Sequence, residues 1–234
     1  MNRVLKLGYA GLSLGLSLGL IPLTLTLPSV AHADTDQRVA RSYPWSSDRL
    51  VLEVPADVEF HPGARWQLTI RAPERTLDQL VVENGRIEAK PHACFSLVPL
   101  CIGYGTQLDD TVQVELTGPA LRDIKVDGAA QIDLDGMHQN RLALKIDGSA
   151  KVRGTGSVGD LVVAIDGAGR IDLGQMTEND AHIGIAGSGT VDIAPTQSVT
   201  VRIDGAGEVR LHSDPPQVIS HIDGAGEVIR VPAG

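Results

Sequence analysis

The chain has 234 residues, of which 20 are Lys or Arg and 29 are Asp or Glu, so its formal net charge at pH 7 is −9. Aromatic residues make up only 3% of the chain, whereas glycine occurs 26 times. An acidic protein repels the phosphate backbone of nucleic acids and the anionic head groups of lipids. The composition therefore argues against nucleic acid as a partner and against electrostatic binding to a membrane surface.

The first 33 residues have the pattern of a signal peptide. Arg3 and Lys6 precede a leucine-rich apolar run over residues 7–27, and the small-x-small sequence AHA ends at Ala33, directly before Asp34. An uncleaved anchor is the alternative, because the run approaches the about 20 residues that span a bilayer. Cleavage removes two positive charges and no acidic one, so the charge changes from −9 to −11. We expect a protein exported to the periplasm, the cell surface or the medium, and not an integral membrane protein after cleavage.

Three regions are expected after the signal peptide. Residues 34–48 are predicted to be a linker, residues 49–119 a β-rich N-terminal part, and residues 120–234 a repeat region. Short alternating runs such as RLVLEV and RWQLTI predict strands in the N-terminal part. The dipeptide Asn84-Gly85 lies between two such runs and predicts a hairpin turn.

The two cysteines, Cys94 and Cys101, lie close together in the segment CFSLVPLC. In an oxidising compartment this spacing predicts a local disulfide that closes a short loop. Two free buried thiols are the alternative. A metal pair is less favoured, because no His or Cys with suitable ligand spacing accompanies them.

Six similar segments recur in the second half: VDGAAQIDL, IDGSAKVRG, IDGAGRIDL, IAGSGTVDI, IDGAGEVRL and IDGAGEVIR. Alternating apolar residues before and after each motif predict two short strands per repeat. One such unit cannot bury its own apolar face, but stacked units can. The sequence therefore predicts an all-β fold, a parallel β-solenoid of about six coils with a period near 19 residues, preceded by a β-rich capping region.

Each Gly-small-Gly motif is predicted to form a corner between two strands. Glycine adopts a positive φ without steric cost, and small residues let the backbones of stacked coils approach closely. The predicted corner glycines are Gly128, Gly148, Gly167, Gly187, Gly205 and Gly224.

An aspartate precedes the corner glycine in five of the six copies, and we expect it to hydrogen-bond the backbone of its own turn. A row of calcium ions is the alternative, since carboxylates stacked about 5 Å apart repel each other. Val or Ile occupies the position where calcium-binding solenoid repeats carry a ligand, which argues against calcium. The candidate calcium ligands are Asp127, Asp147, Asp166, Asp204 and Asp223.

No cofactor site or catalytic residue is predicted. The segment GTGSVG over residues 154–159 matches the glycine pattern of a dinucleotide-binding loop, but a strand follows it where such a loop requires a helix. The histidines occupy different positions of the repeat and form no column or triad. Phe, Trp and Tyr are absent from residue 120 onward, so a glycan bound by the coils would need polar contacts.

The order of these segments resembles a known bacterial family. LVLEVPADVEFHPG, LVVENGRIEAK and VQVELTGPALRDIKVDGAAQIDL precede recurring I-x-G-[AS]-G-x-[IV] units. Together they make residues 49–231 similar to the head GIN domain of putative autotransporter adhesins. The resemblance implies an exported β-solenoid and supplies no catalytic residues. The segment with Cys94 and Cys101 departs from the family pattern as an insertion.

Three functions remain open from the sequence. The leading hypothesis is a non-enzymatic protein that binds or scaffolds at the cell envelope, in the manner of an adhesin, with a protein, glycan or other envelope component as partner. One alternative is an enzyme that acts on polysaccharide with surface carboxylates, and another is a purely structural envelope protein. The charged side chains available to such an enzyme are Asp133, Asp172, Asp192, Arg153, Arg170 and Arg210. A solvent-exposed charged face explains their presence equally well.

Overall fold

A computed structural model describes residues 37–90, 108 and 110–231. This part of the chain consists of β-strands joined in one sheet and a single-turn helix. The elements of the N-terminal part are β1 (Arg38–Tyr43), β2 (Arg49–Leu52), β3 (Ala56–Pro62), β4 (Gln67–Pro73), α1 (Glu74–Leu77), β5 (Leu80–Glu83), β6 (Arg86–Ala89) and β7 (Val112–Gly118). The elements of the repeat region are β8 (Asp123–Val126), β9 (Ala129–Ile146), β10 (Ser149–Ile165), β11 (Ala168–Ile185), β12 (Ser188–Ile203), β13 (Ala206–Leu211), β14 (Gln217–Ile222) and β15 (Glu227–Arg230).

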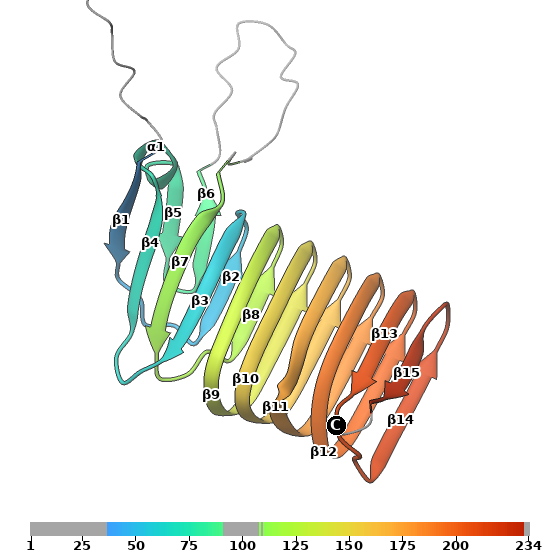
Figure 1. Cartoon of the computed structure of the whole chain (residues 1–234). Helices are drawn as coiled ribbons and strands as arrows, with labels where there is room; N and C mark the ends of the chain where they lie inside the picture. Colours follow the sequence, from blue (N-terminus) through green and yellow to red (C-terminus); the bar gives the residue numbers. More distant parts are fainter. Residues whose placement is uncertain (1–36, 91–107, 109, 232–234) are drawn as a thin grey trace, which may run out of the picture. The chain divides into compact units, whose positions relative to one another are not determined.

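The repeats form a parallel β-solenoid of about five turns, which confirms the predicted fold class (Figure 1). Each of the long strands β9–β12 runs from one glycine corner to the next, bending on the way from one face of the solenoid to the other. Successive strands pair in parallel, with Ile146, Ile165, Ile185 and Ile203 in one register column. Strand β12 pairs with β13 through its first half and with β14 through its second.

Stacked aliphatic side chains fill the space between the two faces. The isoleucines of this register column are buried, as are Val152, Ile171, Val191 and Val209 on the strands that follow the corners, whereas Ile222 before the last corner is exposed. Burial of a Val, Leu or Ile side chain contributes about 1.5–3 kcal/mol to the stability of the fold. The period-two alternation of the sequence therefore sets which residues enter the core.

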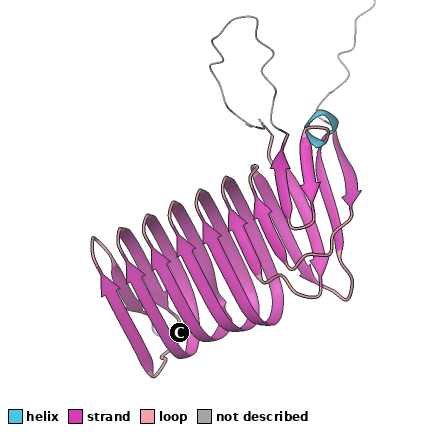
Figure 2. Cartoon of the chain, turned by 180° about the vertical axis from the view of Figure 1, so that it is seen from behind, coloured by secondary structure: helices cyan, strands magenta, loops and turns pink. Residues whose placement is uncertain are grey.

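The N-terminal part continues the same stack. Strands β2 and β3 pair in parallel with β8 and β9, and β6 and β7 add in parallel on the outer side of β2 and β3. The antiparallel strands β5, β4 and β1 then complete the N-terminal end, beside helix α1 (Figure 2). Strand β1 lies within residues 34–48, which the sequence analysis expected to be a linker.

Two predictions concern parts of the chain outside the described residues. The signal peptide, with cleavage between Ala33 and Asp34, precedes the described chain. The disulfide between Cys94 and Cys101 falls between β6 and β7, again outside it. Both therefore stay predictions.

Two positions of the last coil carry polar residues where earlier coils have core residues, while Val218, Ile222 and Val228 continue the apolar columns. Ser220 of β14 is the register partner of Val201, and Arg230 of β15 is the register partner of Leu211. Val201 and Leu211 are buried. The Arg230 Nε lies 3.3 Å from Asp214 Oδ1. A charge at a core position of the last strand disfavours the addition of a further strand. We interpret Ser220 and Arg230 as a polar cap on the solenoid.

Replacing this polar cap with the residues of an internal coil is expected to cause self-association. The double variant Ser220→Val/Arg230→Leu exposes an apolar end with free strand edges, so analytical ultracentrifugation should show larger species than for the unchanged protein. His221→Val/Glu227→Leu is the matched control, because these outward positions do not extend the core columns. Equal sedimentation of both variants would contradict the assignment of a cap.

Candidate binding groove

An open groove runs along the solenoid beside the glycine corners. Its volume is about 1130 Å³, and it extends from β3 across β9–β13 to the last coil. One row of its lining consists of the small residues that follow the corner glycines: Ala129, Ser149, Ala168, Ser188, Ala206 and Ala225. The second row is polar and comprises Gln131, Lys151, Arg170, Thr190, Glu208 and Glu227.

The repeat sequence builds this groove through strand alternation. The first residue after the corner glycine points outward, the second points inward, and the third points outward again. Because the first is always Ala or Ser and the third is usually longer, a row of small residues lies beside a row of polar side chains. The Ala or Ser, which was expected from the sequence to serve corner packing, instead lines a groove that was not predicted. The signal was a small residue at an exposed position in all six copies.

The corner glycines are needed for close stacking and, with one exception, not for a positive φ. Gly224 has a φ of 144°, and the other five corner glycines do not have a positive φ. A Cβ on Gly148, Gly167, Gly187 or Gly205 would instead lie well under 3.0 Å from the carbonyl oxygen of the corner glycine one coil earlier. The close approach expected from the sequence is therefore present, whereas the expected dihedral is not.

The second glycine of the motif makes room for the core. A Cβ on Gly169 would lie 3.0 Å from Ile165 Cδ1, and one on Gly207 would lie 2.9 Å from Ile185 Cδ1. In the copies with a second glycine, an isoleucine before a corner thus fills the space that a side chain at this glycine would take.

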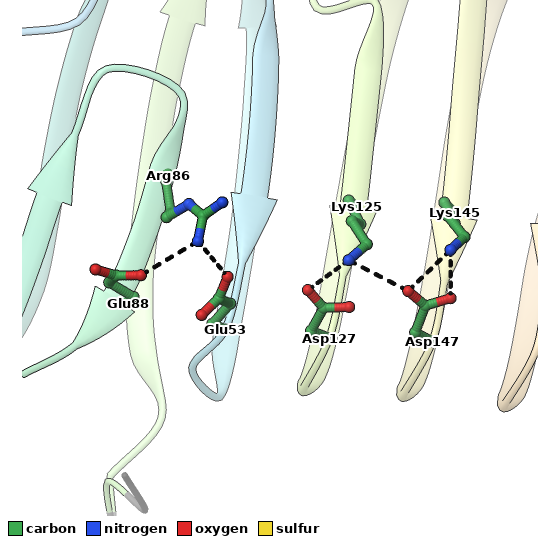
Figure 3. Close-up of polar contacts among 7 residues, drawn as sticks. All are labelled: Glu53, Arg86, Glu88, Lys125, Asp127, Lys145 and Asp147. Carbon is green, nitrogen blue, oxygen red and sulfur yellow. Dashed lines mark hydrogen bonds and ion pairs between the residues drawn. The ribbon is translucent and has the colours of Figure 1, made fainter. Parts of the chain in front are cut away.

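Three of the five corner aspartates, Asp127, Asp147 and Asp204, pair with basic side chains two residues earlier, where a contact with the backbone of the turn was expected. Asp166 and Asp223 have Ala164 and His221 at that position. The Lys125 Nζ lies 2.7 Å from Asp127 Oδ2 and 3.3 Å from Asp147 Oδ2, while the Lys145 Nζ lies 3.0 Å from Asp147 Oδ1 (Figure 3). The hydrogen bond from Lys145, together with that from Lys125, lowers the pKa of Asp147. In the fifth copy, Arg202 Nε similarly lies 2.8 Å from Asp204 Oδ2.

This row of ion pairs extends into the N-terminal part. The Arg86 Nη1 lies 2.8 Å from Glu53 Oε1 and 3.4 Å from Glu88 Oε2, across β6 and β2 (Figure 3). At Asp127, Asp147 and Asp204, ammonium and guanidinium groups thus occupy the place that the calcium alternative gave to metal ions. Among the described residues, no group of three or more His, Cys, Asp or Glu could hold a metal ion.

Five of the six charged residues considered for catalysis are register neighbours on the outer face of the solenoid strands, whereas Arg170 lines the groove itself. Arg153 is the register partner of Asp133 and Asp172, and Asp192 is the partner of Arg210. The Asp192 carboxylate lies 2.8 Å from His212 Nε2 and 3.7 Å from Arg210 Nη1.

Acid catalysis on a glycan requires a carboxyl group that stays protonated near neutral pH and reaches the bound sugar. Burial raises the pKa of Glu178 to about 8. Glu178 is completely buried, however, and does not line the groove. The groove therefore offers binding contacts more readily than acid catalysis.

Two histidines of the repeat region, His138 and His212, make side-chain contacts on different strands. The His138 Nδ1 lies 2.9 Å from Ser157 Oγ, on β9 and β10. His212 instead contacts Asp192, on β12. Within the part of the chain that the structure describes, these contacts do not combine into a Ser-His-Asp triad.

Comparisons with known proteins agree with this architecture. A family model described as "putative auto-transporter adhesin, head GIN domain" matches residues 48–215. A putative adhesin from Bacteroides fragilis has a similar fold, with 15% identity and a TM-score of 0.57, over 83% of this chain and 97% of that chain. A putative lipid binding protein from Parabacteroides distasonis has 19% identity and a TM-score of 0.43, over 83% of this chain and 97% of that chain.

At these identities the first structure shows a shared fold alone, and the second is too distant to support any argument. No curated protein sequence matches the chain. No helix in residues 37–90, 108 and 110–231 has both the length and the apolar character needed to cross a bilayer. Since the family model covers most of the chain, this protein belongs to the family of putative auto-transporter adhesin head GIN domains.

Proposed function

We propose that this protein is exported and binds a linear glycan of the bacterial cell envelope in its groove, without chemically changing it. The groove is the observation that carries the proposal. It continues across successive coils and presents similar small and polar positions at each one. The coils repeat at about 4.8 Å, and a surface that repeats in this way is complementary to an extended polymer of repeating units.

Family membership and the signal-peptide pattern support a role at the envelope. The family description names an adhesin head, and the N-terminal sequence predicts export. The groove lining contains Ser, Thr, Gln and charged side chains and no aromatic residue. Hydrogen bonds to sugar hydroxyls would therefore supply specificity, and the small residues would let the polymer approach the backbone.

Filling the groove is expected to abolish glycan binding. Ala168 is exposed and lines the centre of the groove, so Ala168→Tyr places a ring there without disturbing the core. Purified protein of residues 34–234 should lose at least about tenfold in affinity for envelope polysaccharides, measured by biolayer interferometry. Ala164→Tyr, on the opposite face of β10, should bind like the unchanged protein.

Two results would contradict this function. Equal binding by both tyrosine variants would place the ligand elsewhere on the protein. Release of new reducing ends from a bound polysaccharide would show turnover and favour the enzyme alternative.

A further inference from the structure

Two cationic side chains line the centre of the groove without an anionic partner. Lys151 on β10 and Arg170 on β11 are the groove-lining cations among the described residues. Neither forms an ion pair or a side-chain hydrogen bond with another described residue. They are register partners on adjacent strands, so their backbones lie about 4.8 Å apart.

Basic residues on the other face of the solenoid show how unusual this arrangement is for the molecule. Lys125, Lys145 and Arg202 each contact an aspartate two residues later. Arg170 also has an aspartate two residues later, Asp172, but forms no ion pair with it. The cross-strand neighbours of the groove pair are Gln131 on the β9 side and Thr190 on the β12 side. Two adjacent like charges destabilise a sheet unless an anion compensates them.

The charges of the groove also limit which anions fit. Acidic side chains lie toward both ends: Asp57 on β3, and Glu208 on β13. Each is two strands away from the nearer of the two cations, which corresponds to about 10 Å. Asp57 accepts a hydrogen bond from Gln131 Nε2 at 3.2 Å, and Glu208 is paired with Arg210.

A densely charged polyanion would place further negative groups against these acidic ends. A chain with neutral units on both sides of a single acidic group would avoid that repulsion. Its acidic group would receive charge-assisted hydrogen bonds from Lys151 and Arg170, which are stronger than neutral ones. Its neutral units would lie along the Ala, Ser, Thr and Gln positions.

We propose that the groove selects a linear glycan with widely spaced acidic groups, and that Lys151 and Arg170 bind one such group at its centre. The inference rests on the proposed function and names the chemistry of the ligand. The net charge expected after signal-peptide cleavage is −11, so the rest of the molecule repels anions. An acidic group is therefore directed to this local pair of cations rather than to other parts of the surface.

The test compares acidic polysaccharides that carry one uronic acid per repeat unit with the same polymers after carboxyl reduction. The unchanged residues 34–234 should bind at least one acidic form at least about tenfold more tightly than its reduced form, and added salt should narrow the difference. Lys151→Gln/Arg170→Gln should bind both forms equally. Arg65→Gln/Arg141→Gln removes the same charge from exposed sites outside the groove and should keep the preference.

The outcomes distinguish a failure of the acidic-glycan inference from a failure of the proposed glycan-binding function. Binding that Ala168→Tyr abolishes but that ignores carboxyl reduction would overturn the acidic-glycan inference and keep the groove as a glycan site. Tighter binding to phosphatidylglycerol vesicles than to any polysaccharide would overturn both, because the ligand would then be a lipid.

Discussion

Gly187→Ala is expected to lower the free energy of unfolding by at least about 3 kcal/mol. A Cβ at this position would collide with the carbonyl oxygen of Gly167, which already accepts a hydrogen bond from the Ser188 N–H at 3.0 Å. Both groups are backbone, so no side chain can rotate away and the two coils would have to separate. Thermal and urea unfolding followed by circular dichroism measure the loss.

The same motif supplies a matched control. A Cβ on Gly128 would lie 3.6 Å from its nearest neighbours, the backbone atoms of Val54, because the preceding corner has a different sequence. Gly128→Ala should therefore cost less than about 1 kcal/mol, although it changes the equivalent residue of a copy of the repeat. Equal losses in the two variants would mean that the turn itself requires glycine.

The position of the defect should also be visible. In a solenoid each coil contacts only its neighbours, so a defect in the middle separates the two ends of the stack. Limited proteolysis of Gly187→Ala should cut the chain near β12 and leave a fragment with the N-terminal coils. Uniform degradation of the whole chain would indicate that the solenoid unfolds as one unit.

The repeat region could be predicted because each coil obeys the same local constraints. Alternating Ile, Val and Leu predict the buried columns, and glycines at steps of 18 to 20 residues predict the corners. Repetition removes the ambiguity of a single short strand, since Ile165, Ile185 and Ile203 must all face inward for the stack to form. The core therefore follows from the sequence without knowledge of the tertiary structure.

The extension of the stack into the N-terminal part could not be predicted in the same way. The corner between β2 and β3 has the sequence Val54-Pro55, which does not show the Gly-small-Gly pattern. Strands β6 and β7 come later in the chain but lie on the far side of β2 and β3 from β8 and β9. Only long-range pairing decides that order, and a local pattern contains no information about it.

The candidate site depended on register as well. The parallel register aligns the small residues in a continuous row and places Lys151 beside Arg170. The basic partners of three corner aspartates were easier to predict than the groove. The triplets KVD, KID and RID place a cation and an acid two residues apart on one face of a strand. That spacing favours an ion pair over a backbone contact.

Glu178 is a buried acid at a mismatch between two coils. Strand β11 uses the residues from Asp172 to Asp180 where β12 uses the shorter segment from Asp192 to Ser198, so the ladder is interrupted there. The Glu178 Oε2 accepts a hydrogen bond from the Ala194 N–H at 2.9 Å, and its Oε1 has no partner. The carboxyl group thus supplies an acceptor that the interrupted ladder lacks.

Another polar side chain has a similar role in a coil nearer the N-terminal end of the stack. Gln139 on β9 accepts a hydrogen bond from the Leu121 N–H at 3.1 Å and donates to the Leu121 carbonyl at 2.7 Å. Polar side chains at this bend therefore complete the backbone pairing of a neighbouring segment. Glu178 differs from Gln139 in that it titrates.

Burial raises the pKa of Glu178 from its ordinary 4.5 to about 8, although the hydrogen bond from Ala194 opposes the shift. In the unfolded chain the carboxyl loses its proton near pH 4.5, while in the folded protein it keeps the proton until near pH 8. The folded state thus binds one more proton between these values, so the contribution of Glu178 to stability is fully present below pH 4.5 and is lost as the pH rises toward 8.

Glu178→Gln should remove this pH dependence, because an amide keeps the acceptor for Ala194 and cannot ionise. At pH 5 the variant and the unchanged protein should differ in unfolding free energy by less than about 1 kcal/mol. At pH 9 the variant should be more stable by about 3 kcal/mol or more. Glu83→Gln, at an exposed position of β5, should follow the unchanged protein at both pH values. Urea unfolding at pH 5 and pH 9 measures these differences. If Glu178→Gln lost as much stability between the two pH values as the unchanged protein, the Glu178 carboxyl would already be ionised in the folded state at pH 5. The interrupted ladder would then contain an unneutralised charge.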